Sequence, residues 1–320
     1  MHLLLVGPGA LGCLLSAILT KGIGSTGDRL TILDYNRNRA EYLTGEGIVY
    51  QLGETEETIA VTAVSDPRGL DPVAPVDVVL LCVKSYDVAA SLDFCRPLLS
   101  EKTLLIFLQN GISHLGLGDL IAPATAAYGT TTEGATLLSQ GHVRHAGRGV
   151  TYLGFPESPT DHFAHLIDGT RAVLAAGGLQ VEVTERIIAR IWAKLFINVG
   201  INALTATLGC KNGELLTISG VDRRMKSAIA EAMLVAKAQG IDIMDDPYLA
   251  TKIVCKKTAE NVSSMLQDVR NKRRTEIDAI NGAVEALGRS NYIQTPENSL
   301  LCRQVKEIEA AYPTPPVPRP

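Results

Sequence analysis

The chain has 320 residues, of which 46% are hydrophobic and 20% are charged. This composition is typical of a globular protein large enough for two domains, each with a core of its own. The 30 basic and 34 acidic residues leave a formal net charge of −4 without an evident basic face, which argues against a nucleic-acid partner.

The cysteines and the apolar runs point to the cytoplasm. Six cysteines are scattered without a C-x-x-C pair, as expected for reduced, buried thiols. Residues 1–6 lack the basic flank and the length of a secretory signal, and the longest apolar runs are too short to cross a bilayer. We therefore expect a cytoplasmic protein with no membrane partner.

Short apolar runs alternate with helical patterns up to about residue 180, which predicts a parallel sheet made of β-α-β units. The predicted strands are residues 2–6, 29–33, 76–83, 103–108, 124–130, 142–148, 151–153 and 180–183. The later strands follow closer turns and could be antiparallel. From about residue 185 the pattern is helical instead. The predicted helices are residues 187–208, 222–239, 247–260, a long segment of about 261–287, and 296–311.

A glycine-rich turn follows the first predicted strand. It reads Gly7-Pro8-Gly9-Ala10-Leu11-Gly12, a G-x-G-x-x-G pattern that opens a small, apolar helix. The first glycine makes the tight turn, the second lets a pyrophosphate approach the backbone, and the third lets the helix pack closely on the strand. The helix N-terminus adds N–H groups and the positive end of its dipole. A plain glycine-rich turn is the alternative, but the strand before it and the helix after it favour dinucleotide binding.

These patterns together predict an α/β Rossmann-type domain over residues 1–183, with a parallel sheet plus extra strands. An all-α domain follows over residues 184–320 and ends in a proline-rich tail that we expect to be extended.

Asp34 ends the second predicted strand, 22 residues after Gly12. A carboxylate there would accept hydrogen bonds from the ribose hydroxyls and repel a 2′-phosphate, which favours NAD. Arg37 and Arg39 could instead hold that phosphate and favour NADP. Asp34 could also simply cap the next helix. The expected cofactor is therefore NADP or NAD, with Asp34 favouring NAD.

Further polar residues follow the predicted strands. Lys84, Asn110 and the segment 129–135 each come directly after an apolar run. In open α/β sheets, ligands bind beyond the carboxyl ends of the strands, so we expect these residues near a ligand. Asn110-Gly111 is also simply a favoured turn.

One predicted helix carries a polar stripe in an otherwise apolar sequence. Lys194, Asn198 and Asn202 are four residues apart and share one helix face. Buried amides and ammonium groups need partners, so the stripe is either a narrow solvated edge or a ligand site. A lysine there could give a proton to an oxygen as negative charge develops on it.

A second polar group lies in the predicted helix over residues 261–287. Ser264 and Asp268 share a face of it, and Glu276 lies three turns further on. The paired histidines His142 and His145 have no cysteine or carboxylate cluster beside them in the sequence, so we expect no metal site.

With these motifs in place, the chain resembles the ketopantoate reductase (2-dehydropantoate 2-reductase) family nearly from end to end. The matching motifs are the turn at 7–12, Val83-Lys84-Ser85, Gln109-Asn110-Gly111, Gly129-Thr130-Thr131-Thr132, Trp192-Ala193-Lys194-Leu195, Asn212-Gly213-Glu214-Leu215, Ser263-Ser264-Met265-Leu266-Gln267-Asp268, Thr275-Glu276-Ile277-Asp278, Ile280-Asn281-Gly282 and Pro296-Glu297-Asn298.

The resemblance implies an enzyme that reduces ketopantoate to (R)-pantoate, on the route to pantothenate and coenzyme A. Lys194 would give the proton to the 2-oxo group as hydride arrives from the nicotinamide, and Glu276 would help orient Lys194. The residues implied to hold the substrate are Asn198, Asn202, Asn212 and Ser264. The residues implied to contact the cofactor, beside the loop 7–12, are Lys84, Asn110, Glu276 and the backbone at Ala135.

Two departures and two alternatives accompany the resemblance. Family members that use NADP commonly carry an arginine directly after the second strand, where this chain has Asp34-Tyr35, and the link at 22–29 is longer than usual. A reductase of another branched 2-oxo acid or an imine would keep the same motifs. A non-catalytic dinucleotide sensor would have no reason to keep Lys194, the asparagines and Glu276 together. We expect a small-molecule 2-oxo acid as the partner, and a monomer or a homodimer.

Overall fold

The computed structural model describes residues 1–24, 27–70 and 75–313, and the chain divides into two compact units. Unit 1 consists of Met1–Gln109 and His114–Arg190, and unit 2 of Asn110–Ser113 and Ile191–Pro320. The division falls seven residues beyond the boundary expected at 183/184, and a four-residue loop from the first half of the chain belongs to unit 2. The link residues 25–26 and the proline-rich tail from residue 314 onward lie outside the described residues.

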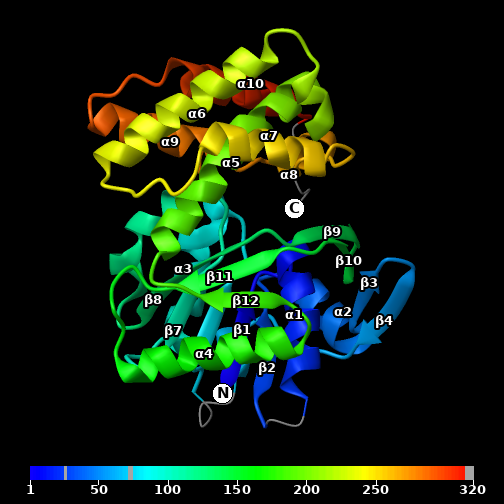
Figure 1. Cartoon of the computed structure of the whole chain (residues 1–320). Coiled ribbons are helices and arrows are strands. Elements are labelled where there is room, and N and C mark those ends of the chain that lie inside the picture. The colour runs from blue at the N-terminus through cyan, green and yellow to red at the C-terminus, as the bar shows by residue number, and fades with distance from the viewer. Residues whose placement is uncertain (25–26, 71–74, 314–320) are drawn as a thin grey trace. The chain divides into compact units, whose positions relative to one another are not determined.

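The main sheet of unit 1 has the strand order β12-β11-β8-β7-β6-β1-β2-β5 (Figure 1). Its strands are β1 (His2–Val6), β2 (Arg29–Leu33), β5 (Ala63–Val64), β6 (Val78–Leu81), β7 (Leu104–Phe107), β8 (Thr125–Thr131), β11 (Val150–Gly154) and β12 (Gln180–Val183). From β5 to β8 all pairs are parallel, whereas β11 runs antiparallel to β8. The chain order reverses at β1, and in sheets of this kind ligands bind at such a point, beyond the carboxyl ends of the strands, here β1 and β6. The predicted parallel sheet with extra strands is confirmed.

The helices of unit 1 cover this sheet. They are α1 (Ala10–Ile23), α2 (Arg37–Glu46), α3 (Val88–Cys95) and α4 (Asp161–Ala176). Helices α1 and α4 approach so closely that a Cβ on Gly22 would lie 1.9 Å from the Val173 carbonyl oxygen. All five residues of β1 are buried, and the four after His2 are apolar, as expected for a strand covered on both faces.

A second sheet in unit 1 has the order β4-β3-β10-β9 and packs on α1. Its strands are β3 (Ile48–Leu52), β4 (Thr55–Ile59), β9 (Gly134–Ser139) and β10 (His142–Gly147). Only β10 is predicted from the sequence. Four of the five residues of β4 are exposed, and no residue of β9 is fully buried, so neither strand has the apolar pattern of a buried strand. Strand β3 does begin with the apolar residues Ile48-Val49-Tyr50, and the prediction misses it.

Unit 2 is helical, as predicted. Its helices are α5 (Ile187–Leu208, which begins in unit 1), α6 (Val221–Ala238), α7 (Pro247–Lys257), α8 (Ser264–Arg270), α9 (Asn281–Ser290) and α10 (Pro296–Ala310), of which α6, α9 and α10 pack together (Figure 1).

Short 3₁₀ turns of both units complete the fold at η1 (Pro67–Gly69), η2 (Ser85–Asp87), η3 (Arg96–Leu98), η4 (Ser113–Gly116), η5 (Gly118–Ile121) and η6 (Asn212–Leu216).

The long helix expected over residues 261–287 is wrong. Helix α8 ends at Arg270 and α9 begins at Asn281, with a non-helical segment between them. Lys272 has a φ of 51°, a left-handed conformation that cannot continue a helix, and the amide of Arg273 donates to the Asp268 carbonyl at 2.9 Å. Glu276 therefore lies on this segment and not on the helix that carries Ser264.

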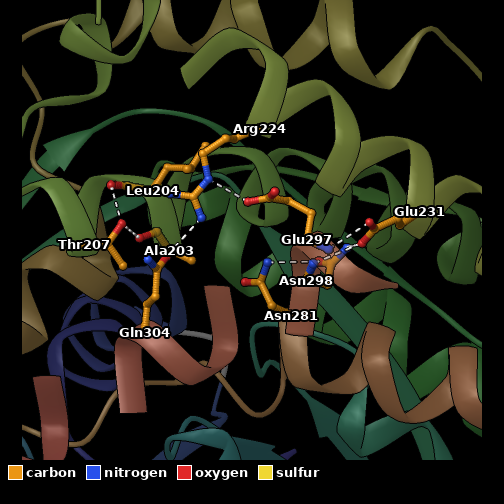
Figure 2. A network of polar contacts seen from close by, with 9 residues as sticks. All are labelled: Ala203, Leu204, Thr207, Arg224, Glu231, Asn281, Glu297, Asn298 and Gln304. Carbon is orange, nitrogen blue, oxygen red and sulfur yellow. Dashed lines mark hydrogen bonds and ion pairs between the residues drawn. The ribbon is translucent and has the colours of Figure 1, made fainter. Parts of the chain in front are cut away.

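Buried polar contacts tie α6, α9 and α10 together (Figure 2). The Glu231 carboxylate accepts from the amide of Glu297 and from both the amide and the Nδ2 of Asn298, at 2.8–3.0 Å. Asn281 Nδ2 donates to Asn298 Oδ1 at 3.0 Å. Asn298 Nδ2 also donates to the Ala228 carbonyl at 3.0 Å. Four hydrogen bonds at this fully buried asparagine explain why the Pro-Glu-Asn motif belongs to the framework of unit 2.

One described helix, α5, is long and apolar enough to cross a membrane, with a mean hydropathy of 1.4 in its most apolar window. Of that window, 61% is buried inside the protein. Helix α5 is therefore mostly a core helix of the protein. The uninterrupted apolar runs of the sequence are shorter than this helix, because polar residues such as Lys194 interrupt them.

Candidate functional site

The glycine turn has the geometry that a pyrophosphate site requires. Gly7 has a φ of 90°, and a Cβ there would lie 2.4 Å from Val83 Cγ1. A Cβ on Gly12 would lie 2.1 Å from the Gly7 carbonyl oxygen, whereas around Gly9 the space is open for 4 Å. No side chain caps the N-terminus of α1, and its first turn carries no acidic residue. The loop therefore leaves backbone N–H groups for an anionic ligand and fits a dinucleotide cofactor.

Asp34 does not present a free carboxylate at the end of β2. Its side chain has no exposed surface and forms an ion pair with Arg39, whose Nε and Nη2 both donate to it, Nη2 at 2.7 Å. Its Oδ1 also accepts the Asn36 amide at 3.0 Å. Asn36, and not Asp34, caps α2, through a hydrogen bond from the Arg39 amide at 3.0 Å. The Arg39 guanidinium lies 5.6 Å from the ring centre of Tyr35, which is 77% exposed.

The other candidates of unit 1 lie beside the same crevice or on the second sheet. Lys84 comes three residues after the end of β6 and precedes η2. Gln109 follows β7 and donates from Nε2 to the carbonyls of Leu81 and Val83, at 2.8 and 3.1 Å, which fixes the carboxyl ends of these two strands together. Ala135 lies in β9, opposite His145 of β10.

In unit 2, three predicted residues form a continuous polar chain. Lys194 Nζ donates to Asn110 Oδ1 at 2.8 Å, and Asn110 Nδ2 donates to Glu276 Oε2 at 3.0 Å. The loop that carries Asn110 is held because the Ile112 amide donates to the Ala279 carbonyl at 3.1 Å. Gly111 has a φ of 80° and a Cβ there would lie 2.0 Å from the same carbonyl oxygen, so the Asn-Gly sequence serves a close approach as well as a turn.

The sequence does not reveal that Asn110 links the other two. An amide can accept from an ammonium and donate to a carboxylate at the same time, so Asn110 joins Lys194 to Glu276 without a direct ion pair. Its position in unit 2, immediately after a strand of unit 1, could not be found from local patterns.

The environment of Lys194 changes its acidity. Burial lowers the pKa of Lys194 from the ordinary value of 10.5 to about 8, and the opposing attraction of the Glu276 carboxylate limits the decrease. Glu276 itself is only 5% exposed. A lysine with a pKa of about 8 exchanges a proton readily near neutral pH, as a general acid or base must.

The remaining candidates in unit 2 differ in exposure. Asn198 and Asn202 lie on α5, one and two turns after Lys194, and their side chains make no hydrogen bond among the described residues. The Asn212 Nδ2 donates to Thr258 Oγ1 at 2.9 Å, which leaves its buried Oδ1 without a partner in the described part of the chain. Ser264 is exposed at the start of α8. The residue before it, Ser263, is instead buried and bonds Thr205 of α5 at 2.7 Å.

No group of three or more histidine, cysteine or carboxylate side chains able to hold a metal ion occurs within the described residues. The six cysteines are free thiols, and burial raises the pKa of Cys13 to about 12.

Comparison with known proteins identifies the family. The model of the ketopantoate reductase PanE/ApbA family matches residues 3–158, and the model of the ketopantoate reductase PanE/ApbA C-terminal region matches residues 186–309. A 2-dehydropantoate 2-reductase of Halobacterium salinarum is 32% identical over 299 residues, which cover 92% of this chain and 95% of that protein. The chain belongs to the ketopantoate reductase family. The family consists of NAD(P)-dependent oxidoreductases that act on a small keto acid.

Solved structures of the same fold extend the comparison. A PanE/ApbA family ketopantoate reductase from Ralstonia eutropha JMP134 is 30% identical and superposes with a TM-score of 0.85, covering 97% of this chain and 99% of that chain. The ternary structure of D-mandelate dehydrogenase with NADH and anilino(oxo)acetate has a TM-score of 0.88 at 23% identity, over 97% and 99% of the two chains. The second likeness is one of fold alone.

We predict opposite effects for alanine at two glycines of the loop. Gly9→Ala has room for its Cβ, so Tm stays within about 2 °C while the dissociation constant for NADPH rises about tenfold or more, because the methyl group occupies the approach of the pyrophosphate. Gly12→Ala forces its Cβ against the Gly7 carbonyl. We expect it to lower the free energy of unfolding by about 2 kcal/mol and Tm by several degrees. Thermal unfolding and NADPH fluorescence titration measure both. Equal losses of Tm in the two variants would contradict this division.

Proposed function

We propose that this chain is a 2-dehydropantoate 2-reductase that reduces ketopantoate to (R)-pantoate with NADPH or NADH. The observation that carries the proposal is the hydrogen-bonded chain from Lys194 through Asn110 to Glu276, in a member of the ketopantoate reductase family. A dinucleotide sensor without catalysis would have no use for a buried ammonium with a pKa of about 8.

The residues of this chain supply the proton and the charge that carbonyl reduction needs. A nicotinamide nucleotide, when bound, would supply hydride to the 2-oxo carbon. Lys194 donates its proton to the carbonyl oxygen, and before that its positive charge stabilises the negative charge developing there. The Asn110 Oδ1 accepts a hydrogen bond from one ammonium N–H and so orients the other two, while Glu276 holds the Asn110 amide in place by accepting from its Nδ2. Lys194 is left neutral and regains its proton from solvent before the next turnover.

The substrate's polar groups require partners that unit 2 offers. Asn198 and Asn202 lie on the face of α5 that carries Lys194, and their amides can donate to the carboxylate of a 2-oxo acid. We assign the substrate hydroxyl and carboxylate to these two residues together with Asn212 and Ser264.

The second candidate function is the reduction of another branched 2-oxo acid. Because D-mandelate dehydrogenase has the same fold, the scaffold alone does not select ketopantoate over another branched 2-oxo acid. The decisive experiment measures initial rates of NADPH and NADH oxidation with ketopantoate, pyruvate, 2-oxoisovalerate and phenylglyoxylate.

We expect ketopantoate to have the highest kcat/KM of these acids. Lys194→Ala should lower kcat by about 10²- to 10⁴-fold because it removes the general acid, whereas the exposed control Lys237→Ala should retain full activity. Preferential turnover of another acid would move the assignment to the second candidate. Wild-type-like turnover by Lys194→Ala would remove this lysine from the mechanism.

The pH dependence follows from the lowered pKa of Lys194. Reduction needs the ammonium form, so kcat for ketopantoate reduction should be flat at low pH and fall as the pH rises through about 8, while pantoate oxidation should rise over the same range. Glu276→Gln removes the carboxylate that raises the pKa of Lys194, so its falling limb should move to lower pH. Stopped-flow rates between pH 6 and 10 test this, and a limb that stays in place or moves upward in Glu276→Gln would contradict it.

We further propose that NADPH is the better cofactor, bound through Arg39. Although an isolated carboxylate at Asp34 favours NAD, here the carboxylate is covered and neutralised by Arg39 and cannot receive ribose hydroxyls without displacing it. What faces outward is the Arg39 guanidinium, 29% exposed, beside the Tyr35 ring. A cation held by a buried carboxylate suits a 2′-phosphate, and a flat exposed ring suits an adenine.

The Arg39 proposal predicts a selective defect. Arg39→Gln should raise KM for NADPH about 10- to 100-fold, the worth of a charge-assisted hydrogen bond, and change KM for NADH less than about threefold. Arg37→Gln is the matched control, because Arg37 is 79% exposed and pairs only with Glu41 on the same helix. Parallel effects on both cofactors, or a wild-type preference for NADH, would refute the role of Arg39.

A further inference from the structure

A buried polar cluster in the second sheet of unit 1 has no part in the chemistry described above. His145 Nε2 lies 2.6 Å from Glu133 Oε2, and His145 Nδ1 lies 3.0 Å from the Tyr50 hydroxyl. The side chains of Glu133 and His145 are only 1% and 2% exposed, and Tyr50 is 6% exposed. The three residues lie far apart in the sequence: Tyr50 is in β3, Glu133 is the residue before β9, and His145 is in β10.

The cluster gives hydrogen-bond partners to a carboxylate and an imidazole that are removed from water. A carboxylate removed from water needs hydrogen-bond donors, and His145 Nε2–H donates to Glu133. His145 Nδ1 then accepts from the Tyr50 hydroxyl when the ring is neutral, or donates to its oxygen when the ring is charged. Each ring nitrogen thus has one partner, so the imidazole is fixed in one orientation.

What the cluster holds in place is a short stretch of backbone. The Glu133 side chain is 1% exposed although the residue as a whole is partly exposed, so the exposed surface of Glu133 belongs to its main chain. Gly134 and Ala135, which carry no side chain or a single methyl group, are also partly exposed. Ala135 pairs directly with His145. Next to it the ladder between β9 and β10 is irregular, between His145 and Gly147, and so provides less restraint from strand pairing. The Glu133 side chain supplies the missing restraint.

We propose that Glu133, His145 and Tyr50 are positioning residues that hold the exposed backbone of residues 133–135 as a docking edge for the nicotinamide nucleotide. The inference rests on the proposed function. Residues 133–135 follow the carboxyl end of β8, which runs parallel to β7, and ligands of such sheets bind beyond the carboxyl ends of the strands. Helix α1, whose N-terminus offers the phosphate site, packs on β9 and β10, so the glycine loop and this edge are held on one framework within unit 1.

A neighbouring pair in the same strand provides the matched control. His142, at the other end of β10, lies 3.3 Å from Glu56 of β4. That pair is much more exposed, at 26% and 50%, and His142 pairs in the ladder with Ser139 and not with Ala135. The two histidines therefore differ in the feature that the proposal depends on, which is the link to residues 133–135.

The test compares NADPH binding, turnover and backbone protection in five proteins: wild type, Glu133→Ala, Glu133→Gln, Tyr50→Phe and the control His142→Asn. We expect Glu133→Ala to raise the dissociation constant for NADPH by about tenfold, with kcat at saturating cofactor changed less than about twofold, because a misplaced contact edge weakens binding and leaves the lysine chemistry intact. Glu133→Gln keeps an acceptor for Nε2–H and should restore most of the affinity. Tyr50→Phe removes one hydroxyl only, so it stays folded and should show a smaller loss of affinity.

Hydrogen exchange of the cofactor-free proteins gives a second readout. Amides of residues 134–137 should exchange faster in Glu133→Ala and Tyr50→Phe than in wild type or His142→Asn. Faster exchange with wild-type NADPH affinity would overturn the proposal, because the cluster would then be structural only. Equal losses of affinity in His142→Asn would overturn it as well. A wild-type protein that binds NADPH tightly but reduces no 2-oxo acid would defeat the proposed function and leave this inference standing.

Discussion

The burial of one lysine ammonium is the constraint around which unit 2 is organised. Taking a charge out of water is costly unless the surroundings return hydrogen bonds and an opposite charge. Asn110 accepts a hydrogen bond from the ammonium group, and Glu276 provides the opposite charge. The Glu276 carboxylate is hydrogen-bonded to Asn110, which lies between it and the lysine. Because compensation is incomplete, the pKa of Lys194 falls to about 8 rather than staying near 10.5, and the group becomes a usable acid.

Polar side chains of unit 2 also differ in how many of their hydrogen bonds are made. Glu231 and Asn298 are buried and bonded to each other and to the backbone, which fixes the packing of α6 and α10. Asn198 and Asn202, by contrast, keep side-chain amides with no partner among the described residues. The complete hydrogen bonds of Glu231 and Asn298 hold helices together, whereas the open amides of Asn198 and Asn202 are suited to receive a substrate.

The sequence predicts some of this well because the signals are local. The strands at 2–6, 29–33 and 180–183 and the helix at 187–208 have the bounds expected, since apolar runs and periodicity are properties of neighbouring residues. The roles of the glycines at 7–12 follow from a motif whose spacing has a mechanical reason. In contrast, β4 and β9 are too exposed to have a strand pattern, and the break after α8 depends on a left-handed Lys272 that helix propensity does not indicate. The Asp34–Arg39 ion pair and the link through Asn110 depend on side-chain geometry, so the residues could be named in advance but their partners could not.

The loop Asn110–Ser113 makes unit 2 discontinuous in the chain. A protein cut at residue 190 would separate the helices from the Asn110 amide oxygen, which accepts a hydrogen bond from Lys194, even though every helix of unit 2 after that point would be present. The gene segment for the helical half is therefore not a self-sufficient module. Recombination that exchanged the helical half between relatives would combine its lysine with an Asn110 loop from another protein. Because the hydrogen bond needs both residues, substitutions in one half of the chain affect the other half.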